Sequence, residues 1–365
     1  MKTTLLSLLL SGFFLALLDA QNLNLLSGLN NNLQESSGLI YIQNVLISHN
    51  DSGSEPELYE LDPTNGSVSR TVVLANASNI DWEDVAFDDN YIYIGDFGNN
   101  NGSRSDLKIY RIDLNSYWNT PNDTVYADTI SFNYGDQQSF NPSPFSTNFD
   151  AEALVALDNQ LLLFSKNWGN QWTKVYAIPK QPGNYTLQVI DSLNVGSFIT
   201  GACSSSVDSK LYLIGYDFST AYFYQWEYPN FDDSALHKYS LNIPSGYSYQ
   251  IEGLSNADSS KFYISSEALG TSLSALYLFD FELLSSLHHL NKEPSFIFPN
   301  PASEWIEIKQ ENASSFEVYN LSGQLVLQSN TAIFSVSMLE LGCYAILSKD
   351  KQGQILGKDI LLLKK

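Results

Sequence analysis

Cysteine and histidine are scarce in this chain of 365 residues, which has two cysteines and four histidines. Cys203 and Cys343 lie far apart in the sequence, so a scaffold held by several disulfides is excluded and two buried free thiols are expected. The histidines do not cluster, and only His49 lies in a polar motif. Zinc and copper need clustered thiolate or imidazole ligands, so neither metal is predicted.

Basic residues are also few. The chain has 18 Lys and Arg residues against 40 Asp and Glu residues, which gives a formal net charge of −22. Nucleic-acid binding depends on basic contacts to phosphates, so this balance argues against a nucleic-acid partner. It fits cations, cationic partners or simply an acidic, well-solvated surface.

Long apolar runs are missing from most of the chain. After the charged start at Met1 and Lys2, residues 5–18 form one apolar run, and Ala20 offers a cleavage point before Gln21. This pattern predicts a secretory signal peptide at residues 1–20. No later run is long enough to span a bilayer, so no transmembrane segment is predicted in the mature protein.

What the sequence does contain is a repeat. Glu35, Glu83, Glu152 and Glu252 each stand before a small residue and an apolar run, and Thr200 stands in the same setting. The spacing is about 50 to 70 residues, which is typical of a β-propeller. Each unit can be read as four strands; residues 85–87, 91–95, 108–112 and 124–132 form one such set, and no helix is expected among them.

The fold class predicted for residues 21–290 is therefore all-β, a five-bladed β-propeller, with six blades as the alternative. The last repeat supplies only three clear strands. Residues 22–26, at the other end of the domain, are expected to add the fourth strand and so remove an exposed sheet edge.

The repeat also predicts a metal site. Residues at the start of the innermost strands should lie near one mouth of the central channel, which would bring Glu35, Glu83, Glu152, Glu252 and Thr200 together. Converging carboxylates repel one another unless they protonate, recruit a basic side chain or bind a cation. A ring of carboxylate and hydroxyl oxygens suits Ca²⁺, so calcium is the expected cofactor. The alternative is that each residue bonds to the backbone and ties its blade to the next.

A second set of polar residues follows the second strands and should lie on the same face. We expect this rim to bind an extracellular ligand; the alternative is that its residues only form tight turns. For an anionic ligand, Lys166 and Arg104 are the candidate cations. The rim residues are His49, Asn50, Asp51, Asp96, Lys166 and Asn167.

The segment 294–365 differs from the repeats. Strand-like pieces separated by tight-turn signals predict a small C-terminal β-sandwich. Pro299-Asn-Pro301, residues 318–326, residues 341–344 and the terminal Lys364-Lys365 resemble the C-terminal sorting domain of the type IX secretion system of Bacteroidetes. The resemblance implies passage through the periplasm, handling by the type IX machinery, and a final place in the medium or on the outer cell surface.

The repeat domain resembles a family of secreted, largely uncharacterised propellers. The resemblance rests on residues 49–53, 81–84, 95–100, 109–111, 150–154 and 175–178. More loosely, blades that open on Glu or a hydroxyl residue are similar to calcium-dependent apyrase and phytase propellers. The sequence shows no serine or cysteine nucleophile with a histidine base, so binding of an extracellular ligand is the favoured function. The alternative is a calcium-dependent phosphoester or phosphoanhydride hydrolase.

Overall fold

The computed structural model describes residues 21–205, 210–230, 235–258, 260–281, 296–320 and 324–364. The predicted signal peptide lies outside these residues, as do residues 282–295 between the predicted domains. The described chain is almost entirely β-structure and divides into two compact units between Phe279 and Asp280. Within the described ranges, no helix has the length and apolar character needed to cross a membrane.

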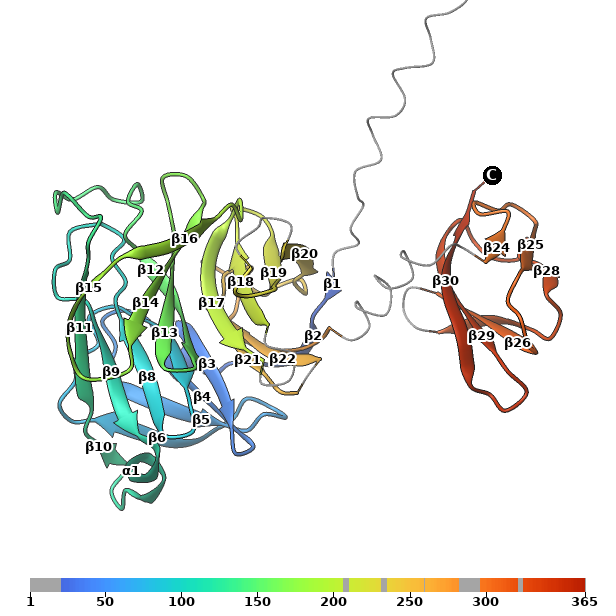
Figure 1. The fold of residues 1–365 in the computed structure, drawn as a ribbon. Coiled ribbons are helices and arrows are strands. Elements are labelled where there is room, and N and C mark those ends of the chain that lie inside the picture. Colours follow the sequence, from blue (N-terminus) through green and yellow to red (C-terminus); the bar gives the residue numbers. More distant parts are fainter. Residues whose placement is uncertain are drawn as a thin grey trace, which may run out of the picture. The chain divides into compact units, whose positions relative to one another are not determined.

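The first unit contains five sheets within the described residues, and Figure 1 shows them following one another in chain order. The first sheet consists of β3 (Ser36–Ile42), β4 (Val45–Asn50), β5 (Glu57–Leu61), β6 (Val68–Leu74) and β10 (Thr124–Val125). The second consists of β7 (Trp82–Phe87), β8 (Tyr91–Asp96), β9 (Lys108–Asp113), β11 (Asp128–Tyr134) and β15 (Gly183–Leu187). The third consists of β12 (Ala151–Leu157), β13 (Gln160–Ser165), β14 (Thr173–Pro179) and β16 (Val189–Leu193).

The fourth sheet consists of β17 (Phe198–Ser204), β18 (Leu211–Tyr216), β19 (Ala221–Trp226), β20 (Leu236–Asn242) and β1 (Gln21–Asn22). The fifth consists of β21 (Ile251–Asn256), β22 (Lys261–Ser266), β23 (Ala275–Asp280) and β2 (Asn24–Gly28). The first strand of each sheet packs against the first strand of the next, in the cyclic order β3, β7, β12, β17, β21 and back to β3. Radial sheets around a common axis are the arrangement of a β-propeller.

The start of the described chain joins the last two sheets. β2 pairs with β23 and supplies the fourth strand of the fifth sheet, which confirms the prediction made for residues 22–26. β1 pairs in parallel with β20, so the same segment also covers the outer edge of the fourth sheet. An edge covered in this way is protected from pairing with other chains.

The helices are short, and the sequence patterns did not predict them. α1 (Leu114–Asn119) follows β9, and the side chain of Asp113 caps it by accepting a hydrogen bond from the Ser116 N–H. η1 (Asn31–Leu33) is a single 3₁₀ turn before β3. Helices of six and three residues are too short to give a periodic hydrophobic pattern, which explains why both were missed.

Apolar side chains fill the space between neighbouring sheets. Trp82 of β7 is fully buried among side chains of the first and second sheets, and Tyr176 of β14 lies in the core between the second and third. Between the third and fourth sheets, the rings of Phe164 and Trp226 meet edge to face, with 6.2 Å between centroids. Dense packing of this kind holds the inner strands in register around the axis.

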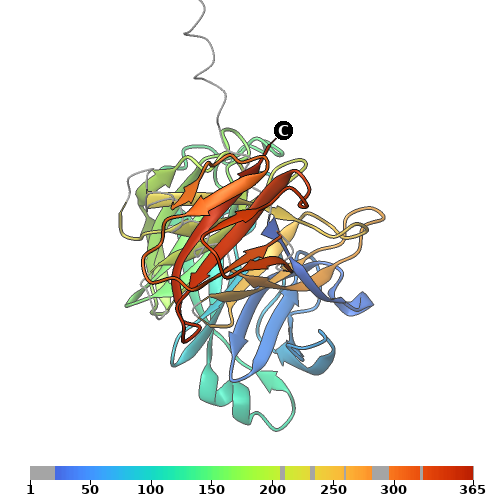
Figure 2. The same cartoon turned by 90° about the vertical axis from the view of Figure 1, so that its right-hand side faces the viewer.

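The second unit has two antiparallel sheets within its described residues. One consists of β24 (Ile297–Phe298), β25 (Trp305–Ile308) and β28 (Ile333–Ser335). The other consists of β27 (Leu325–Ser329), β26 (Ser315–Tyr319), β29 (Gly342–Lys349) and β30 (Ile355–Leu363), and the last two form the long red hairpin of Figures 1 and 2. Ile306 and Phe334 of the first sheet share a core with Phe316, Val318 and Ile346 of the second.

The two cysteines are free thiols, as predicted. Both residues are half-buried rather than buried.

Candidate functional site

A β-bulge fixes the position of each candidate residue on the inner strands. The pairing of β7 with β8 slips between Trp82 and Val85, and β12, β17 and β21 slip at equivalent points. A bulge breaks the alternation of a strand and aims its extra residue differently from its neighbours. The residues that lie in these bulges, all buried, are Glu83, Glu152, Thr200 and Glu252.

Glu35 does not belong to this set. It is exposed and lies in the turn before β3, whereas the bulge of β3 falls between Ser36 and Leu39. Ser37 therefore occupies the position that Glu83 has in β7, and its hydroxyl donates to the Glu83 carbonyl oxygen. The prediction chose Glu35, which lies in the correct repeat but two residues before the bulge position. The repeat was aligned on its acidic residues, and Ser37 has no charge by which it could be aligned.

Thr200 behaves like Ser37. Its hydroxyl donates to the carbonyl oxygen of Ile251 on the next inner strand, at 2.6 Å. The two bulges that carry a hydroxyl thus join neighbouring inner strands. The Thr200 hydroxyl is therefore already used in an inter-strand hydrogen bond, and its role as a metal ligand stays a prediction.

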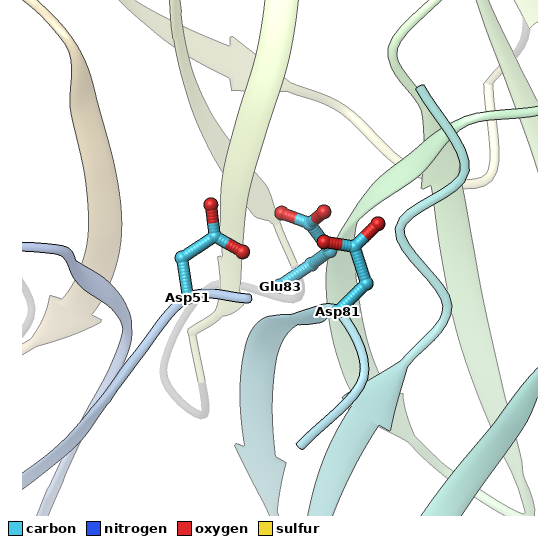
Figure 3. A group of neighbouring side chains, drawn as sticks. All are labelled: Asp51, Asp81 and Glu83. Carbon is cyan, nitrogen blue, oxygen red and sulfur yellow. The ribbon is translucent and has the colours of Figure 1, made fainter. Parts of the chain in front are cut away.

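Two groups of acidic side chains converge where the inner strands begin. Carboxylate oxygens of Asp51, Asp81 and Glu83 lie within 4.8 Å of one another, and Figure 3 shows the three side chains turned toward a common space. Glu83, Asp150 and Glu152 form a second group by the same measure. Glu83 belongs to both, so the five residues make one acidic cluster.

Asp81 and Asp150 enter this cluster through a simple pattern. Each stands two residues before a bulge glutamate, in Asp81-Trp82-Glu83 and Asp150-Ala151-Glu152. In the folded chain the aspartate and the glutamate of each pair lie close together, with carboxylate oxygens within 4.8 Å of each other. Neither aspartate was included among the ligands expected from the sequence.

Backbone and ring donors hold the cluster in place. Oδ1 of Asp150 accepts from the Asn99 N–H at 2.5 Å, and Oδ2 accepts from the Trp168 indole N–H at 2.7 Å. The backbone of Asp51 is fixed by a hydrogen bond from its N–H to the Glu35 carbonyl oxygen, at 2.9 Å. Gly98 leaves room for the acids, because a Cβ there would lie 1.9 Å from Oε1 of Glu83. The carboxylates are thus positioned before any ligand arrives.

Two cations lie near the cluster, and both are already paired. Nζ of Lys166 lies 3.0 Å from Oε2 of Glu152 and 3.2 Å from the Tyr216 hydroxyl. Arg104 binds Asp96 at 2.9 Å. Lys108 also approaches Asp96, at 3.3 Å, so the negative charge of this predicted rim residue is balanced by two cations.

The remaining acids leave an excess of negative charge. Glu252 and Glu267 also interact electrostatically with Lys166 and with each other, so further negative charge lies near the cluster. Burial, with the neighbouring charge of Asp81, raises the pKa of Asp51 to about 7. Burial and the charge of Asp150 raise the pKa of Asp81 to about 6. The pKa values of Glu83, Glu152 and Glu252 are raised as well, chiefly by burial.

These shifts predict that the metal-free protein is stabilised by mild acid. Asp51 and Asp81 bind protons more tightly in the folded chain than their ordinary pKa of 3.8 implies. The contribution of these two groups to the free energy of unfolding in a chelator should therefore fall as the pH rises from about 4 to about 7, by at least about 1 kcal/mol. Thermal unfolding at constant ionic strength would measure this, and Asp51→Asn with Asp81→Asn should flatten the slope. An equal slope in wild type and double variant would contradict the assignment.

The other rim residues organise loops. His49 is fully buried, donates from Nδ1 to the Asn50 carbonyl oxygen at 3.0 Å and lies edge-on to Trp82 with 5.6 Å between ring centroids. Burial lowers the pKa of His49 to about 4, so it is neutral at physiological pH. Asn50 donates to the Asn32 carbonyl oxygen, and Asn167 accepts from the Ser165 hydroxyl. Of these residues, Asp51 and Lys166 reach the acidic cluster, and a ligand-binding role for the others stays a prediction.

Asp84 binds the backbone of neighbouring inner strands, which was the alternative role considered for the glutamates. Its carboxylate is fully buried and accepts from the backbone N–H groups of Val85 and Leu154, each at 2.8 Å, and of Ala202. Because these donors lie on β7, β12 and β17, one side chain joins three inner strands. Burial raises the pKa of Asp84 well above its ordinary value.

Comparisons with known proteins identify the second unit. Residues 296–361 match the model of the secretion system C-terminal sorting domain. This confirms the resemblance to the type IX sorting domain, and it means that the chain is exported to the medium or the cell surface. A search of curated proteins finds no significant relative.

Solved structures similar to the chain include several with low identity. The WD40 β-propeller domain of Doa1 is 15% identical with a TM-score of 0.32, covering 66% of this chain and 62% of that one. The major allergen Mala s 1 of Malassezia sympodialis is 9% identical with a TM-score of 0.43, covering 68% and 92%. A quinoprotein alcohol dehydrogenase-like protein of Bacteroides thetaiotaomicron is 12% identical with a TM-score of 0.32, covering 91% and 67%. This chain thus spans less than two thirds of the Doa1 domain's chain.

Proposed function

We propose that this exported protein is a five-bladed propeller with a C-terminal β-sandwich sorting domain, and that its acidic cluster binds Ca²⁺ beside a surface for an extracellular ligand. The observation that carries the proposal is the excess of inward-facing acids over cations. Asp51, Asp81 and Glu83 have oxygens within 4.8 Å of one another, while Lys166 is engaged by Glu152. Repulsion of this kind is relieved by a bound cation.

The blade count is supported by the packing of the inner strands. β3, β7, β12, β17 and β21 contact one another in cyclic order, and β21 contacts β3 across the ends of the series. A sixth blade would have to separate two of these neighbours. The two facing sheets and shared core of the second unit likewise support a sandwich.

The donor set suits calcium. Ca²⁺ binds six to eight oxygens at about 2.3–2.6 Å, so ligands on opposite sides of the ion lie up to about 5 Å apart. The spacing within each acidic group, 4.8 Å or less, is compatible with a shared ion. Oε2 of the buried Glu252 also has no hydrogen-bond partner among the described residues. In the bound protein, Asp51, Asp81, Glu83, Asp150 and Glu152 would hold the ion, which would offset part of their charge and fix the loops that carry them.

Calcium should stabilise the folded protein measurably. At a calcium concentration one hundred times the Kd, mass action adds about 2.7 kcal/mol, which raises the Tm by roughly 5–10 °C. Glu83→Gln removes charge from both acidic groups, so it should weaken calcium binding at least about tenfold and reduce the rise in Tm. Isothermal titration with CaCl₂ and thermal unfolding with and without EGTA would measure both effects.

A matched control is Asp258→Asn, which removes an exposed acid in the turn before β22. This variant should bind calcium like the wild type. If the wild type showed neither heat of binding nor a calcium-dependent Tm, the calcium proposal would be wrong.

The hydrolase alternative remains a separate prediction. A phosphate-bearing substrate would need cations that are free to contact it, whereas Lys166 and Arg104 are both bonded to carboxylates. Release of phosphate from nucleotides or phytate in the presence of calcium, lost in Glu83→Gln, would support it over ligand binding.

A further inference from the structure

A row of four aromatic rings, exposed at its two ends, lies beside the acidic cluster. The ring centroids of Phe145 and Trp168 are 5.0 Å apart, those of Trp168 and Phe198 are 4.7 Å apart, and those of Phe198 and Phe218 are 5.6 Å apart. Phe145 is 64% exposed and Phe218 78% exposed, although both are large and apolar. Phe198 is buried and Trp168 is half-buried, so they form a buried support that carries the two exposed rings. We call these four residues the aromatic lip.

The lip is bonded directly to the acidic cluster. The Trp168 indole N–H donates to Oδ2 of Asp150, which is a member of the cluster. Nζ of Lys166 lies 5.0 Å from the centroid of the Trp168 ring and 5.3 Å from that of Tyr216. A ligand that contacts the acidic cluster therefore has the aromatic lip within reach.

The lip is also held in a fixed shape. Phe145 has a φ of 49°, a left-handed conformation that is unfavourable for a bulky residue. Hydrogen bonds from its N–H to the Asn100 carbonyl oxygen and from the Ser146 N–H to the Ser143 carbonyl oxygen maintain it. Strained residues of this kind gather at ligand sites, where the surrounding structure holds them in place.

The charges narrow the chemistry of the ligand. Anions are disfavoured by the surrounding carboxylates and by the pairing of Lys166 and Arg104. A ligand cation that binds over an aromatic ring would compete with Lys166, which already lies near Trp168 and Tyr216. A neutral ligand with hydroxyl oxygens on one side and C–H groups on the other is neither repelled by the carboxylates nor in competition with Lys166.

We propose that the aromatic lip and the acidic cluster together bind a carbohydrate. Ring hydroxyls of the sugar would complete the oxygen coordination of the calcium ion, and the C–H face would lie against Phe145, Trp168 or Phe218. The inference rests on the calcium site of the proposed function and adds the class of ligand. Oxygen ligands are those that Ca²⁺ prefers, and rigid aromatic rings provide apolar contact area.

The test is binding of the purified chain without residues 1–20 to an oligosaccharide array, in CaCl₂ and in EGTA. The double variant Phe145→Ala with Phe218→Ala removes the exposed half of the lip. It should lower saccharide binding about tenfold or more while calcium affinity by titration stays unchanged. The control Tyr126→Ala removes an aromatic side chain that is 71% exposed and is not part of the lip, and it should bind like the wild type.

The two proposals fail in different ways. A wild-type chain that binds calcium but no saccharide would overturn the carbohydrate proposal and leave the calcium site standing. Saccharide binding that is unchanged in EGTA would show that calcium does not bridge the protein and the sugar. Equal binding by the wild type and the double variant would show that the aromatic lip does not contact the sugar. Binding of basic peptides that calcium abolishes would show that the site takes a cationic partner instead. Absence of calcium binding in the titration would refute the proposed function itself.

Discussion

Replacing Asp84 by alanine is expected to destabilise the first unit by about 3–5 kcal/mol. The substitution leaves the N–H groups of Val85, Leu154 and Ala202, which are all buried residues, without their acceptor. It also opens a cavity where three inner strands meet. Urea unfolding followed by tryptophan fluorescence would measure the change, since Trp82 and Trp226 are buried in this unit.

Two further variants distinguish a structural role from a general effect of charge. Asp84→Asn keeps one acceptor oxygen and the side-chain volume, so it should lose less stability than Asp84→Ala. Asp89→Ala removes an exposed aspartate near the other end of β7 and should change the free energy of unfolding by less than about 0.5 kcal/mol. A stability of Asp84→Ala within 1 kcal/mol of the wild type, roughly the spread of ordinary substitutions, would contradict the role of Asp84 as the central inter-strand acceptor.

Deletion of residues 296–361 is expected to abolish export across the outer membrane. The deleted segment is the one that matches the sorting domain, and it has its own hydrophobic core, separate from the cores between the sheets of the first unit. In a bacterium with a type IX system, immunoblots of the periplasm, the cell surface and the medium should find the truncated chain only in the periplasm.

A reciprocal construction controls for misfolding of the truncated chain. A periplasmic reporter protein fused to residues 296–365 should gain export to the surface or medium. If the truncated chain reached the surface at the wild-type level, or if the fused reporter stayed in the periplasm, the sorting function of this segment would be refuted.

The sequence predicted the parts of the molecule that depend on local pattern. Glu83, Glu152 and Glu252 were identified as equivalent because each stands before an apolar strand, and all three lie in the bulges of inner strands. The contribution of the N-terminal strand to the last sheet followed from counting strands in a repeat. Glu35 was misplaced because the equivalent residue, Ser37, has no charge by which to recognise it.

The parts that were missed depend on contacts between distant residues. The parallel edge strands β10 and β15 pair with β6 and β11 of sheets that were already complete, and no sequence periodicity encodes such a pairing. The bond from Trp168 to Asp150 and the pairing of Arg104 with Asp96 join separate loops at the same mouth. Such contacts decide whether an acidic side chain is paired with a cation. The sequence could therefore list candidate ligands, but it could not show that Asp96 is paired with cations whereas Asp81 belongs to the acidic cluster.

The measurement that tests the central claim most directly is anomalous diffraction from a crystal of the purified chain grown with calcium, combined with elemental analysis of the same sample. We expect about one calcium ion per chain, bound between the carboxylates of Asp51, Asp81, Glu83, Asp150 and Glu152. An elemental analysis that finds no calcium, or an anomalous peak that lies only elsewhere on the molecule, would contradict this expectation.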